Sequence, residues 1–323
     1  MNMVKVGVPH WTSDALLARL PPEAKVEMLP ATPDAPIDID FWIAPVLAKD
    51  GQPVAPWLRG VKVVQSVQAG VDWLRPLVPQ GATLCDAQGV HNIGTSEWAV
   101  TAILASLKFL PFYFDLQQKS KWVLRKETVV HYESIYKIQE HIYPIVLIEE
   151  LAGKRVLIVG YGSIGKSIED RLAPFGVEIT RIARSARPGV EPITRFAELL
   201  PAADVIVLTV PSTPDTKHLI NADVIARMKQ GALLVNAARG SVVDTDALVQ
   251  ALNDGRIRAA LDVTDPEPLP EDHPLWKAPN VFITPHVAAS SPLFMARAFD
   301  LAAEQIQRFA KGEPLKNVVD GLY

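Results

Sequence analysis

The sequence predicts an α/β protein built on doubly wound parallel sheets. Short apolar runs recur along the chain and alternate with helical patterns, as parallel strands and their crossover helices do. One of these runs leads directly into a glycine-rich turn, Gly160-Tyr161-Gly162-Ser163-Ile164-Gly165. The chain has 323 residues, which exceeds the usual size of a single domain, so two domains are expected.

The first domain is predicted from four short apolar runs separated by proline-rich loops, at 4–8, 37–44, 61–64 and 83–85. A polar capping signal, Thr95-Ser96-Glu97, then precedes an apolar helix over 98–110. This helix is apolar nearly all round, so we expect it to be buried, between the domains.

The second domain is predicted from six further apolar runs, enough for a complete doubly wound sheet: 155–159, 177–182, 205–208, 233–235, 259–261 and 281–283. Ser290-Ser291-Pro292 is a helix-start signal, and the helix predicted from it continues to Lys311 and packs back on the first domain. We therefore expect a discontinuous substrate domain, 1–94 with 292–323, and a dinucleotide-binding domain, 95–291.

The composition indicates a globular protein and no polyanionic partner. The formal net charge is only -4, and 49% of the residues are hydrophobic, so neither nucleic acid nor a membrane surface is expected as a partner. No apolar run approaches the 18 or so residues that span a bilayer, and the start is too interrupted for a signal peptide, so a cytoplasmic protein is expected. The single cysteine, Cys85, lies in an apolar run and is interpreted as a core residue.

The stretch 119–150 carries aromatic residues among charged ones and has no clear period: Trp122, Tyr132, Tyr136 and Tyr143 lie in it. Its basic residues Lys119, Lys121, Arg125 and Lys126 could meet phosphate, but a solvated face fits the acidic chain better. An arm that clasps a second subunit would also expose aromatic residues in this way.

The glycine-rich turn predicts a dinucleotide site, because a strand precedes it and a helix follows. Gly160 allows the tight turn, Gly162 lets the backbone approach a pyrophosphate, and Gly165 allows close packing of helix on strand. Ser163 and Ile164 open that helix, whose N-terminus attracts the anion.

The residues about 20 positions beyond the turn favour NADP(H), although NAD(H) is possible. An acidic residue there would mark NAD, but Arg184, Ser185 and Arg187 stand in its place, and Glu178 comes too early. A charge-assisted bond to a 2′-phosphate contributes about 1.5 to 3 kcal/mol.

Three later strands end in groups suited to carbonyl reduction. The run 233–235 leads through Ala237 to Arg239, whose guanidinium can grip a carboxylate and polarise the neighbouring carbonyl. Asp262 and Glu267 follow the next strand, and His286 follows the last. Histidine supplies a proton near neutral pH, and a carboxylate beside it raises its pKa.

These residues resemble the D-isomer-specific 2-hydroxyacid dehydrogenase family, from Ser66-Val67-Gln68-Ala69-Gly70 to the last helix. The resemblance implies two Rossmann-like domains with the active site in the cleft between them. It implies that Arg239 binds the substrate carboxylate, that Glu267 pairs with His286, and that His286 is the acid/base. It assigns the nicotinamide carboxamide to Asp262, and the adenosine and pyrophosphate border to Val210, Pro211 and Thr216.

Within the family, the run 269–276 with Pro285-His286-Val287 is similar to the glyoxylate/hydroxypyruvate reductases, several of which use NADPH. Gln68, Ala69 and Gly70 correspond to the family's substrate loop, where glycine usually stands in place of Gln68. The backbone amides that would hold the carboxylate are therefore set differently, or the Gln68 side chain adds a contact.

The leading hypothesis is a reductase, expected to be a homodimer, that converts a small 2-keto acid to the D-2-hydroxy acid. Two alternatives stay open: a family member acting on a larger 2-keto acid, and a non-catalytic NAD(P)-sensing protein on the same fold. The remaining histidines show no metal-ligand spacing, so no metal is expected. A homodimer is the default assembly for symmetric soluble enzymes.

Overall fold

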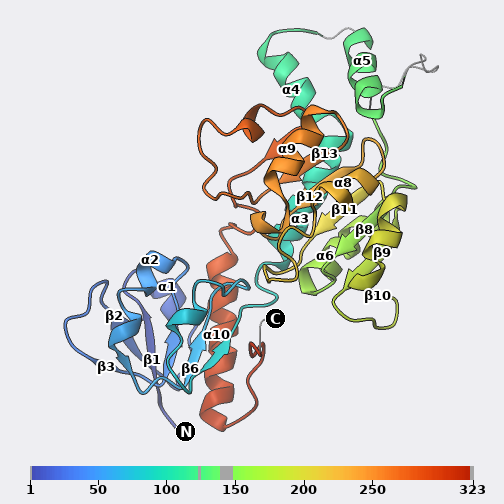
Figure 1. Cartoon of the computed structure of the whole chain (residues 1–323). Coiled ribbons are helices and arrows are strands. Elements are labelled where there is room, and N and C mark those ends of the chain that lie inside the picture. Colours follow the sequence, from blue (N-terminus) through green and yellow to red (C-terminus); the bar gives the residue numbers. More distant parts are fainter. Residues whose placement is uncertain (1, 123–124, 139–147, 321–323) are drawn as a thin grey trace. The chain divides into compact units, whose positions relative to one another are not determined.

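The computed structural model describes residues 2–122, 125–138 and 148–320 (Figure 1). The chain divides into two compact units, Met1–Asn92 with Ser290–Tyr323, and Ile93–Ala289. Each unit is built on one main sheet in which every pairing between strands is parallel, so the expected fold class is confirmed. The domain limits expected from the sequence stay a prediction, because compactness alone does not show that each unit folds independently.

The first unit holds a five-stranded sheet in the order β2-β1-β4-β6-β7. This is a doubly wound order, since the chain starts near the middle and builds outward in both directions. The strands are β1 Val4–Pro9, β2 Ala24–Leu29, β4 Phe41–Ile43, β6 Val63–Gln65 and β7 Thr83–Cys85. A separate two-stranded sheet pairs β3 Ile37–Asp38 with β5 Leu58–Arg59, so the expected strand over 37–44 is in fact two strands.

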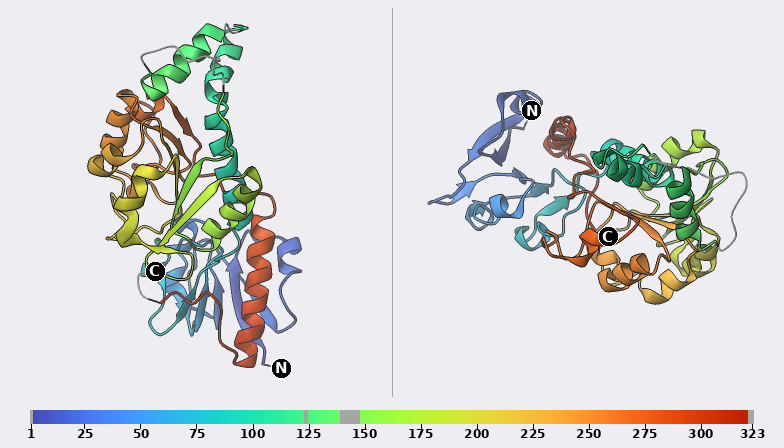
Figure 2. Two further views of the ribbon diagram at one scale, coloured as in Figure 1. Left: turned by 90° about the vertical axis from the view of Figure 1, so that its right-hand side faces the viewer. Right: turned by 90° about the horizontal axis from the view of Figure 1, so that it is seen from above.

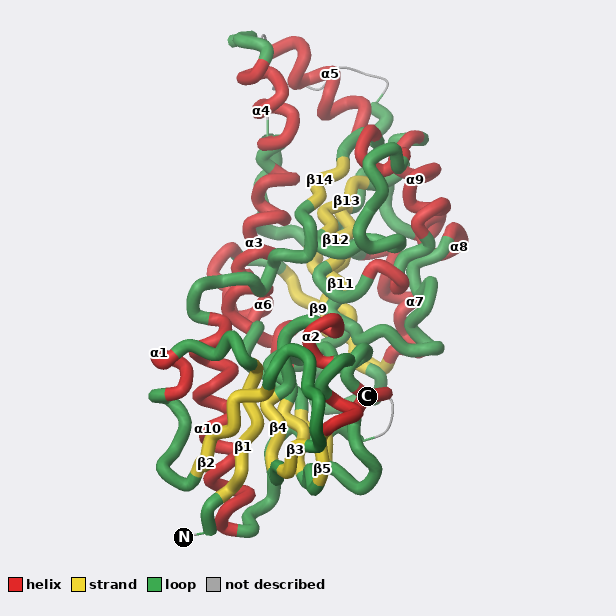
Figure 3. The backbone as a smooth tube through the Cα atoms, turned by 90° about the vertical axis from the view of Figure 1, so that its left-hand side faces the viewer, coloured by secondary structure: helices red, strands yellow, loops and turns green. Residues whose placement is uncertain are grey.

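Both faces of this first sheet are buried, as parallel sheets require. On one face, Val6, Phe41 and Val63 form a core with Phe299 and Ile306 of the last helix, α10 Phe294–Lys311. Figure 3 shows α10 running alongside β1 and β2. The prediction that this helix packs on the first unit is confirmed.

On the other face, Trp42 and Val64 pack with residues of the loops beyond β4 and β6. The short helices α1 Asp14–Leu17 and α2 Ala48–Gly51 complete the unit. Cys85 is fully buried, and burial raises the pKa of its thiol to about 11. It is therefore a core residue, as expected.

The second unit holds a seven-stranded sheet in the order β10-β9-β8-β11-β12-β13-β14. Six of its strands were expected, and the short edge strand β10 was missed. The strands are β8 Arg155–Val159, β9 Glu178–Ala183, β10 Glu191–Pro192, β11 Val205–Leu208, β12 Leu233–Asn236, β13 Arg258–Leu261 and β14 Val281–Ile283.

Helices cover both faces of this second sheet. Helices α3 Asn92–Leu107 and α6 Ser163–Leu172 supply Ile103 and Ile168 to the core on one face. The other face is covered by α7 Phe196–Leu199, α8 Ala222–Arg227 and α9 Thr245–Asn253. The alternation of Val156 and Ile158 with Leu157 and Val159 along β8 sends side chains into both cores.

Two helix starts differ from the prediction. Helix α3 begins at Asn92, so the expected caps Thr95 and Ser96 lie inside it and are buried. Helix α10 begins at Phe294 without a side-chain cap, two positions after Pro292. In both cases a short polar run has the residue types of a helix cap without capping the helix, because tertiary packing decides where the helix begins.

The stretch 119–150, which had no clear period, contains α5 Arg125–Tyr136 and is preceded by α4 Leu110–Gln118. Both helices extend beyond the second sheet (Figure 2). Helices α4 and α5 meet where the rings of Phe112 and His131 stack with centroids 4.3 Å apart. Tyr143 lies outside the described residues. Among the described residues no single helix is long and apolar enough to cross a membrane, although the pair α3 and α4, bent by 67°, passes the same test.

Candidate active site

The predicted site residues of the second unit follow the carboxyl ends of parallel strands, which meet at one edge of the sheet. The chain order reverses between β8 and β11, which are neighbours, because β9 and β10 lie on one side and β12 to β14 on the other. Ligands of doubly wound sheets bind at this switch point, beyond the strand ends. Gly160 follows β8, and Val210 follows β11.

The glycines of the turn after β8 are packed closely at two positions and open at the third, as a pyrophosphate site requires. A Cβ atom on Gly160 would lie 2.6 Å from backbone atoms of Thr209 and Val210, and its φ of +100° also favours glycine. A Cβ on Gly165 would lie 3.1 Å from the Gly160 carbonyl oxygen. A Cβ on Gly162, by contrast, would meet only that oxygen, at 4.0 Å. Gly160 and Gly165 thus serve packing, while the face of Gly162 is open to a ligand at the N-terminus of α6.

The residues expected to contact the adenosine ribose of the cofactor, or its 2′-phosphate, follow the end of β9. Gly160 and Tyr161 both donate their backbone N–H to the Ile182 carbonyl oxygen, at 2.9 and 2.8 Å, so the turn is joined to this strand end. Arg184, Ser185 and Arg187 follow immediately and are exposed. Glu178 begins β9 at its other end, where it pairs with Arg155 at 3.1 Å.

Arg239 is positioned by a buried asparagine that the sequence reasoning missed. Asn236, the last residue of β12, donates from Nδ2 to the Arg239 carbonyl oxygen and accepts the Ala238 N–H, both at 3.0 Å. The next residue, Gly240, has no room for a side chain, because a Cβ would lie 1.9 Å from the Thr264 carbonyl oxygen. Arg239 is therefore held against the loop that leads to Glu267.

Asp262 holds the turn that carries His286. Its Oδ1 accepts the Val287 N–H at 2.9 Å and the Thr284 hydroxyl at 2.6 Å, and its Oδ2 accepts the Ala288 N–H at 2.9 Å. The Asp262 carbonyl oxygen accepts the His286 N–H at 2.7 Å. His286 itself has a φ of +53°, a conformation that costs a non-glycine residue energy and that these bonds stabilise.

His286 and Glu267 form the hydrogen-bonded pair that the sequence led us to expect. His286 Nδ1 lies 2.6 Å from Glu267 Oε1, and both side chains are about half exposed. The bond to Glu267 raises the pKa of His286 above its ordinary value, although burial and Arg239 oppose the shift. The same bond lowers the pKa of Glu267. The pair is thus a carboxylate beside an imidazole that keeps its proton at higher pH than usual.

The remaining predicted cofactor residues line the same edge of the sheet. Val210 is buried against Gly160, and the half-buried Ala237 donates its N–H to the Leu208 carbonyl oxygen. Thr216 turns its hydroxyl to the Pro211 carbonyl oxygen at 2.7 Å, which shapes the loop beyond β11. Gly94 of α3, which the sequence reasoning missed, lets the helix approach the loop after His286, since its Cβ would lie 3.0 Å from the Ala288 carbonyl oxygen.

The predicted substrate loop lies in the first unit, directly after β6. Ser66 Oγ accepts the Gln68 N–H at 3.0 Å and donates to the Gln68 carbonyl oxygen at 2.8 Å. The buried Gln65 donates to the Ser66 and Asp86 carbonyl oxygens. The Gln68 N–H is thus engaged within the loop, and Ala69 and Gly70 follow it half exposed.

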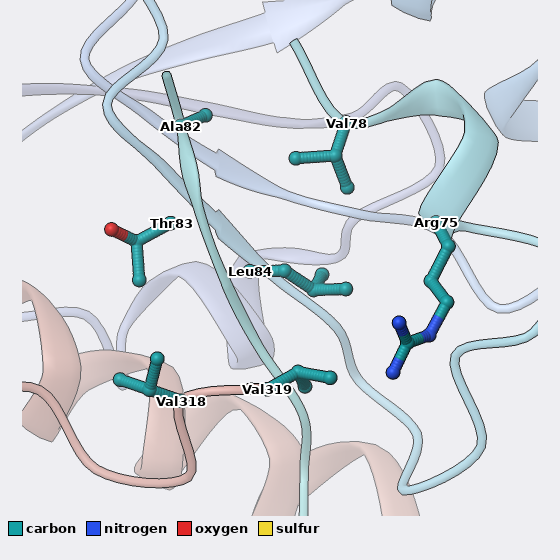
Figure 4. Close-up of a pocket in the computed structure, with 7 residues that line it drawn as sticks. All are labelled: Arg75, Val78, Ala82, Thr83, Leu84, Val318 and Val319. Carbon is teal, nitrogen blue, oxygen red and sulfur yellow. The ribbon is translucent and has the colours of Figure 1, made fainter. Parts of the chain in front are cut away.

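The first unit also has an open pocket of about 490 Å³ beside β7, and none of the predicted site residues lines it (Figure 4). Its lining is Arg75, Val78, Ala82, Thr83, Leu84, Val318 and Val319. Val319 donates its N–H to the Leu84 carbonyl oxygen at 2.9 Å, so the C-terminal segment covers part of the β7 edge.

Residues 100–288 match the family model "D-isomer specific 2-hydroxyacid dehydrogenase, NAD binding domain". The matched segment contains the glycine-rich turn, Arg239, Asp262, Glu267 and His286. The chain belongs to the D-isomer-specific 2-hydroxyacid dehydrogenase family. It is accordingly an NAD(P)-dependent oxidoreductase, as the sequence led us to expect.

Individual proteins are similar to this chain over 81 to 99% of its length. A glyoxylate reductase of Korarchaeum cryptofilum is 30% identical over 96% of this chain and 90% of its own length. An uncharacterized protein of Corynebacterium melassecola is 35% identical over 81% and 83%. The structure of an NADPH-dependent glyoxylate/hydroxypyruvate reductase from Sinorhizobium meliloti, in complex with NADP and sulfate, is 27% identical with a TM-score of 0.80, covering 99% and 98%. Other family members are longer, and the chain spans 48% of two D-3-phosphoglycerate dehydrogenases.

Proposed function

We propose that this enzyme reduces a small 2-keto acid, such as glyoxylate or hydroxypyruvate, to the D-2-hydroxy acid with NADPH. The observation that carries the proposal is the 2.6 Å contact between Glu267 and His286, on the same sheet edge as Arg239 and the glycine-rich turn. The names of the similar reductases agree with this substrate class.

His286 supplies the proton. Because its Nδ1 faces Glu267, the nitrogen available to the substrate is Nε2, from which a proton moves to the keto oxygen. When bound, the reduced cofactor supplies the hydride that adds to the keto carbon. Glu267 stabilises the imidazolium before transfer and keeps the ring oriented, and His286 regains its proton from solvent after the product leaves.

Arg239 binds the substrate carboxylate and polarises the keto group. A guanidinium suits both tasks because its N–H groups lie in one plane and can reach two oxygens at once. The loop Gln68 to Gly70 is proposed to contribute the remaining carboxylate contacts. The position of the site in a cleft between the units stays a prediction.

NADPH is proposed over NADH because Arg184, Ser185 and Arg187 follow the strand end that is joined to the phosphate-binding turn. No acidic residue stands at 183–187 to accept hydrogen bonds from the ribose hydroxyls of NADH. Glu178 lies at the opposite end of β9, and Glu191 of the neighbouring β10 pairs with Arg195 at 2.6 Å. Loss of one charge-assisted contact to the 2′-phosphate, in Arg184→Ala, is expected to weaken NADPH binding about 10- to 150-fold.

The test is a steady-state assay of glyoxylate, hydroxypyruvate and larger 2-keto acids, each with NADPH and with NADH. We expect the small acids with NADPH to give the highest kcat/KM, and His286→Gln to reduce it at least about 100-fold. The exposed His10 provides the matched control, His10→Gln, which should leave kcat/KM unchanged. Turnover of no acid by a protein that binds NADPH would overturn the proposal in favour of a sensor, and preference for the larger acids would overturn the substrate class.

A homodimer is proposed as the assembly. Large apolar side chains are exposed on α4 and just beyond its end. Leu110 and Phe114 of α4 are 53% and 60% exposed, and Trp122, four residues after the helix, is 98% exposed. Such residues are typical of an interface between subunits. Sedimentation should give a dimer that Phe114→Ser weakens, and a monomer at micromolar concentration would contradict the proposal.

A further inference from the structure

Tyr161, the second residue of the phosphate-binding turn, lies where two elements of the cofactor site meet. Its N–H donates to the Ile182 carbonyl oxygen at 2.8 Å, next to the end of β9. Tyr161 thus joins the turn, which is proposed to meet the pyrophosphate, to the strand end that leads to Arg184 and Arg187, which are proposed to meet the 2′-phosphate.

The Tyr161 side chain is held in place by the ion pair between Glu169 and Arg181. Its hydroxyl donates to Glu169 Oε2, the same oxygen that accepts Arg181 Nε at 2.7 Å, and Arg181 Nη2 contacts Glu169 Oε1 as well. Glu169 lies on α6 and Arg181 on β9, and their side chains are only 16% and 31% exposed. The Arg181 guanidinium carbon lies 5.7 Å from the centroid of the Tyr161 ring. This partly buried two-point pair joins α6 to β9 and leaves the ring little freedom.

Arg187 is in turn held by Tyr161, although its side chain is exposed. Its guanidinium carbon lies 5.7 Å from the same ring centroid, and Nη2 donates to the Tyr161 carbonyl oxygen. Its backbone is fixed too, because Arg187 and Val190 exchange two hydrogen bonds, at 3.1 and 2.8 Å, around Pro188 and Gly189. Gly189 has a φ of +73°, so this is the tight turn that proline followed by glycine favours.

We propose that Tyr161 is a specificity-determining positioning residue for NADPH, holding the Arg187 guanidinium at the phosphate-binding turn before the cofactor arrives. The inference rests on the proposed preference for NADPH. An exposed arginine ordinarily loses much side-chain freedom when it binds a phosphate, and holding it beforehand removes part of that cost. Only one of the five guanidinium N–H groups is used by the Tyr161 carbonyl oxygen, so donors remain for the 2′-phosphate.

The test compares the Kd of NADPH with that of NADH, by titration calorimetry, in wild type, Tyr161→Leu, Arg187→Ala and the double variant. Leucine removes the ring and the hydroxyl but keeps the backbone. We expect Tyr161→Leu to weaken NADPH binding roughly 3- to 10-fold, the effect of releasing one long side chain, and to change NADH binding less than 2-fold. Because Tyr161 acts through Arg187, the double variant should bind NADPH no more weakly than Arg187→Ala alone.

Tyr161→Phe is the conservative variant, and it should keep most of the preference because it retains the ring beside Arg187. Equal weakening of NADPH and NADH by Tyr161→Leu would show that Tyr161 only shapes the turn, and additive losses in the double variant would show that it acts apart from Arg187. Either result overturns the inference while the proposed function stands. A wild type that binds both cofactors equally overturns the proposed cofactor preference and this inference together.

Discussion

The two compact units share a sheet plan but fix their carboxyl-edge loops by different means. In the second unit a buried carboxylate, Asp262, and a glycine with no clearance, Gly240, hold the loops that carry His286 and Arg239. In the first unit neutral groups, Ser66 and Gln65, hold the loop that contains Gln68. We infer from this difference that His286 and Arg239 tolerate little displacement, whereas the proposed substrate loop can vary with the acid that it binds.

Gly240→Ala, in the second unit, should cause the largest loss of activity. The added Cβ would lie 1.9 Å from the Thr264 carbonyl oxygen, so the backbone after Arg239 and the loop leading to Glu267 must separate. A displacement of about 1 Å can cost about 100-fold in rate, and we expect at least that loss in kcat/KM.

Gly153→Ala is the matched control for this prediction. Gly153 has a φ of +72° but nothing within 4 Å of its Cβ position, so the variant carries backbone strain of about 1 kcal/mol without a clash. It should keep its kcat/KM, with circular dichroism confirming that both variants are folded. A folded Gly240→Ala enzyme with normal kcat/KM would mean that this close contact does not position Arg239.

Asp262→Asn should come next, with kcat reduced about 10- to 100-fold by the loss of charge-assisted bonds to the His286 turn. An asparagine offers one acceptor oxygen in place of the two that now accept the Val287 and Ala288 N–H groups. Thr284→Val removes only the hydroxyl bond and should cost less. If Asp262 acts mainly on the nicotinamide carboxamide, the change will appear instead in the KM for NADPH, with kcat preserved.

Much of this site could be predicted from the sequence, because parallel strands are short apolar runs and chemistry follows their ends. The expected strands at 155–159, 205–208 and 281–283 have the bounds of β8, β11 and β14. Glu267 and His286, 19 positions apart, were expected to meet and do. Place after a strand predicted that the two residues lie at one edge of the sheet, and the family resemblance predicted that they pair.

The positioning residues could not be predicted, since their roles depend on atoms distant in the chain. Nothing local distinguishes Gly240 or Gly94 from an ordinary loop or helix glycine until Thr264 and Ala288 are seen against them. Asn236 resembles any strand-end polar residue. The edge strand β10 has two residues, too few to show a period.

Glu267→Gln should have an intermediate effect, visible in the pH dependence more than in the maximal rate. The carboxylate raises the pKa of His286, so its removal lowers that pKa. Reduction requires the protonated imidazole, and the decline of reductive kcat/KM with rising pH should therefore begin at lower pH in the variant. Glu271→Gln, in the exposed loop nearby, is the control and should keep the wild-type pH profile. An unchanged pH profile in Glu267→Gln would show that Glu267 does not affect the pKa of His286.

Ser66→Ala should have the smallest effect, and it tests how much displacement the loop of the first unit tolerates. It removes both hydrogen bonds between the Ser66 hydroxyl and Gln68, but the Gln68 carbonyl oxygen still accepts the Ala87 N–H at 3.0 Å. A neutral hydrogen bond contributes about 0.5 to 1.5 kcal/mol, so the KM for the keto acid should rise about 2- to 10-fold while kcat is preserved. Ser13→Ala, whose hydroxyl makes no capping bond, is the matched control and should change neither constant. A collapse of kcat in Ser66→Ala would show that the loop of the first unit is as intolerant of displacement as the His286 turn, and the contrast between the two units would not hold.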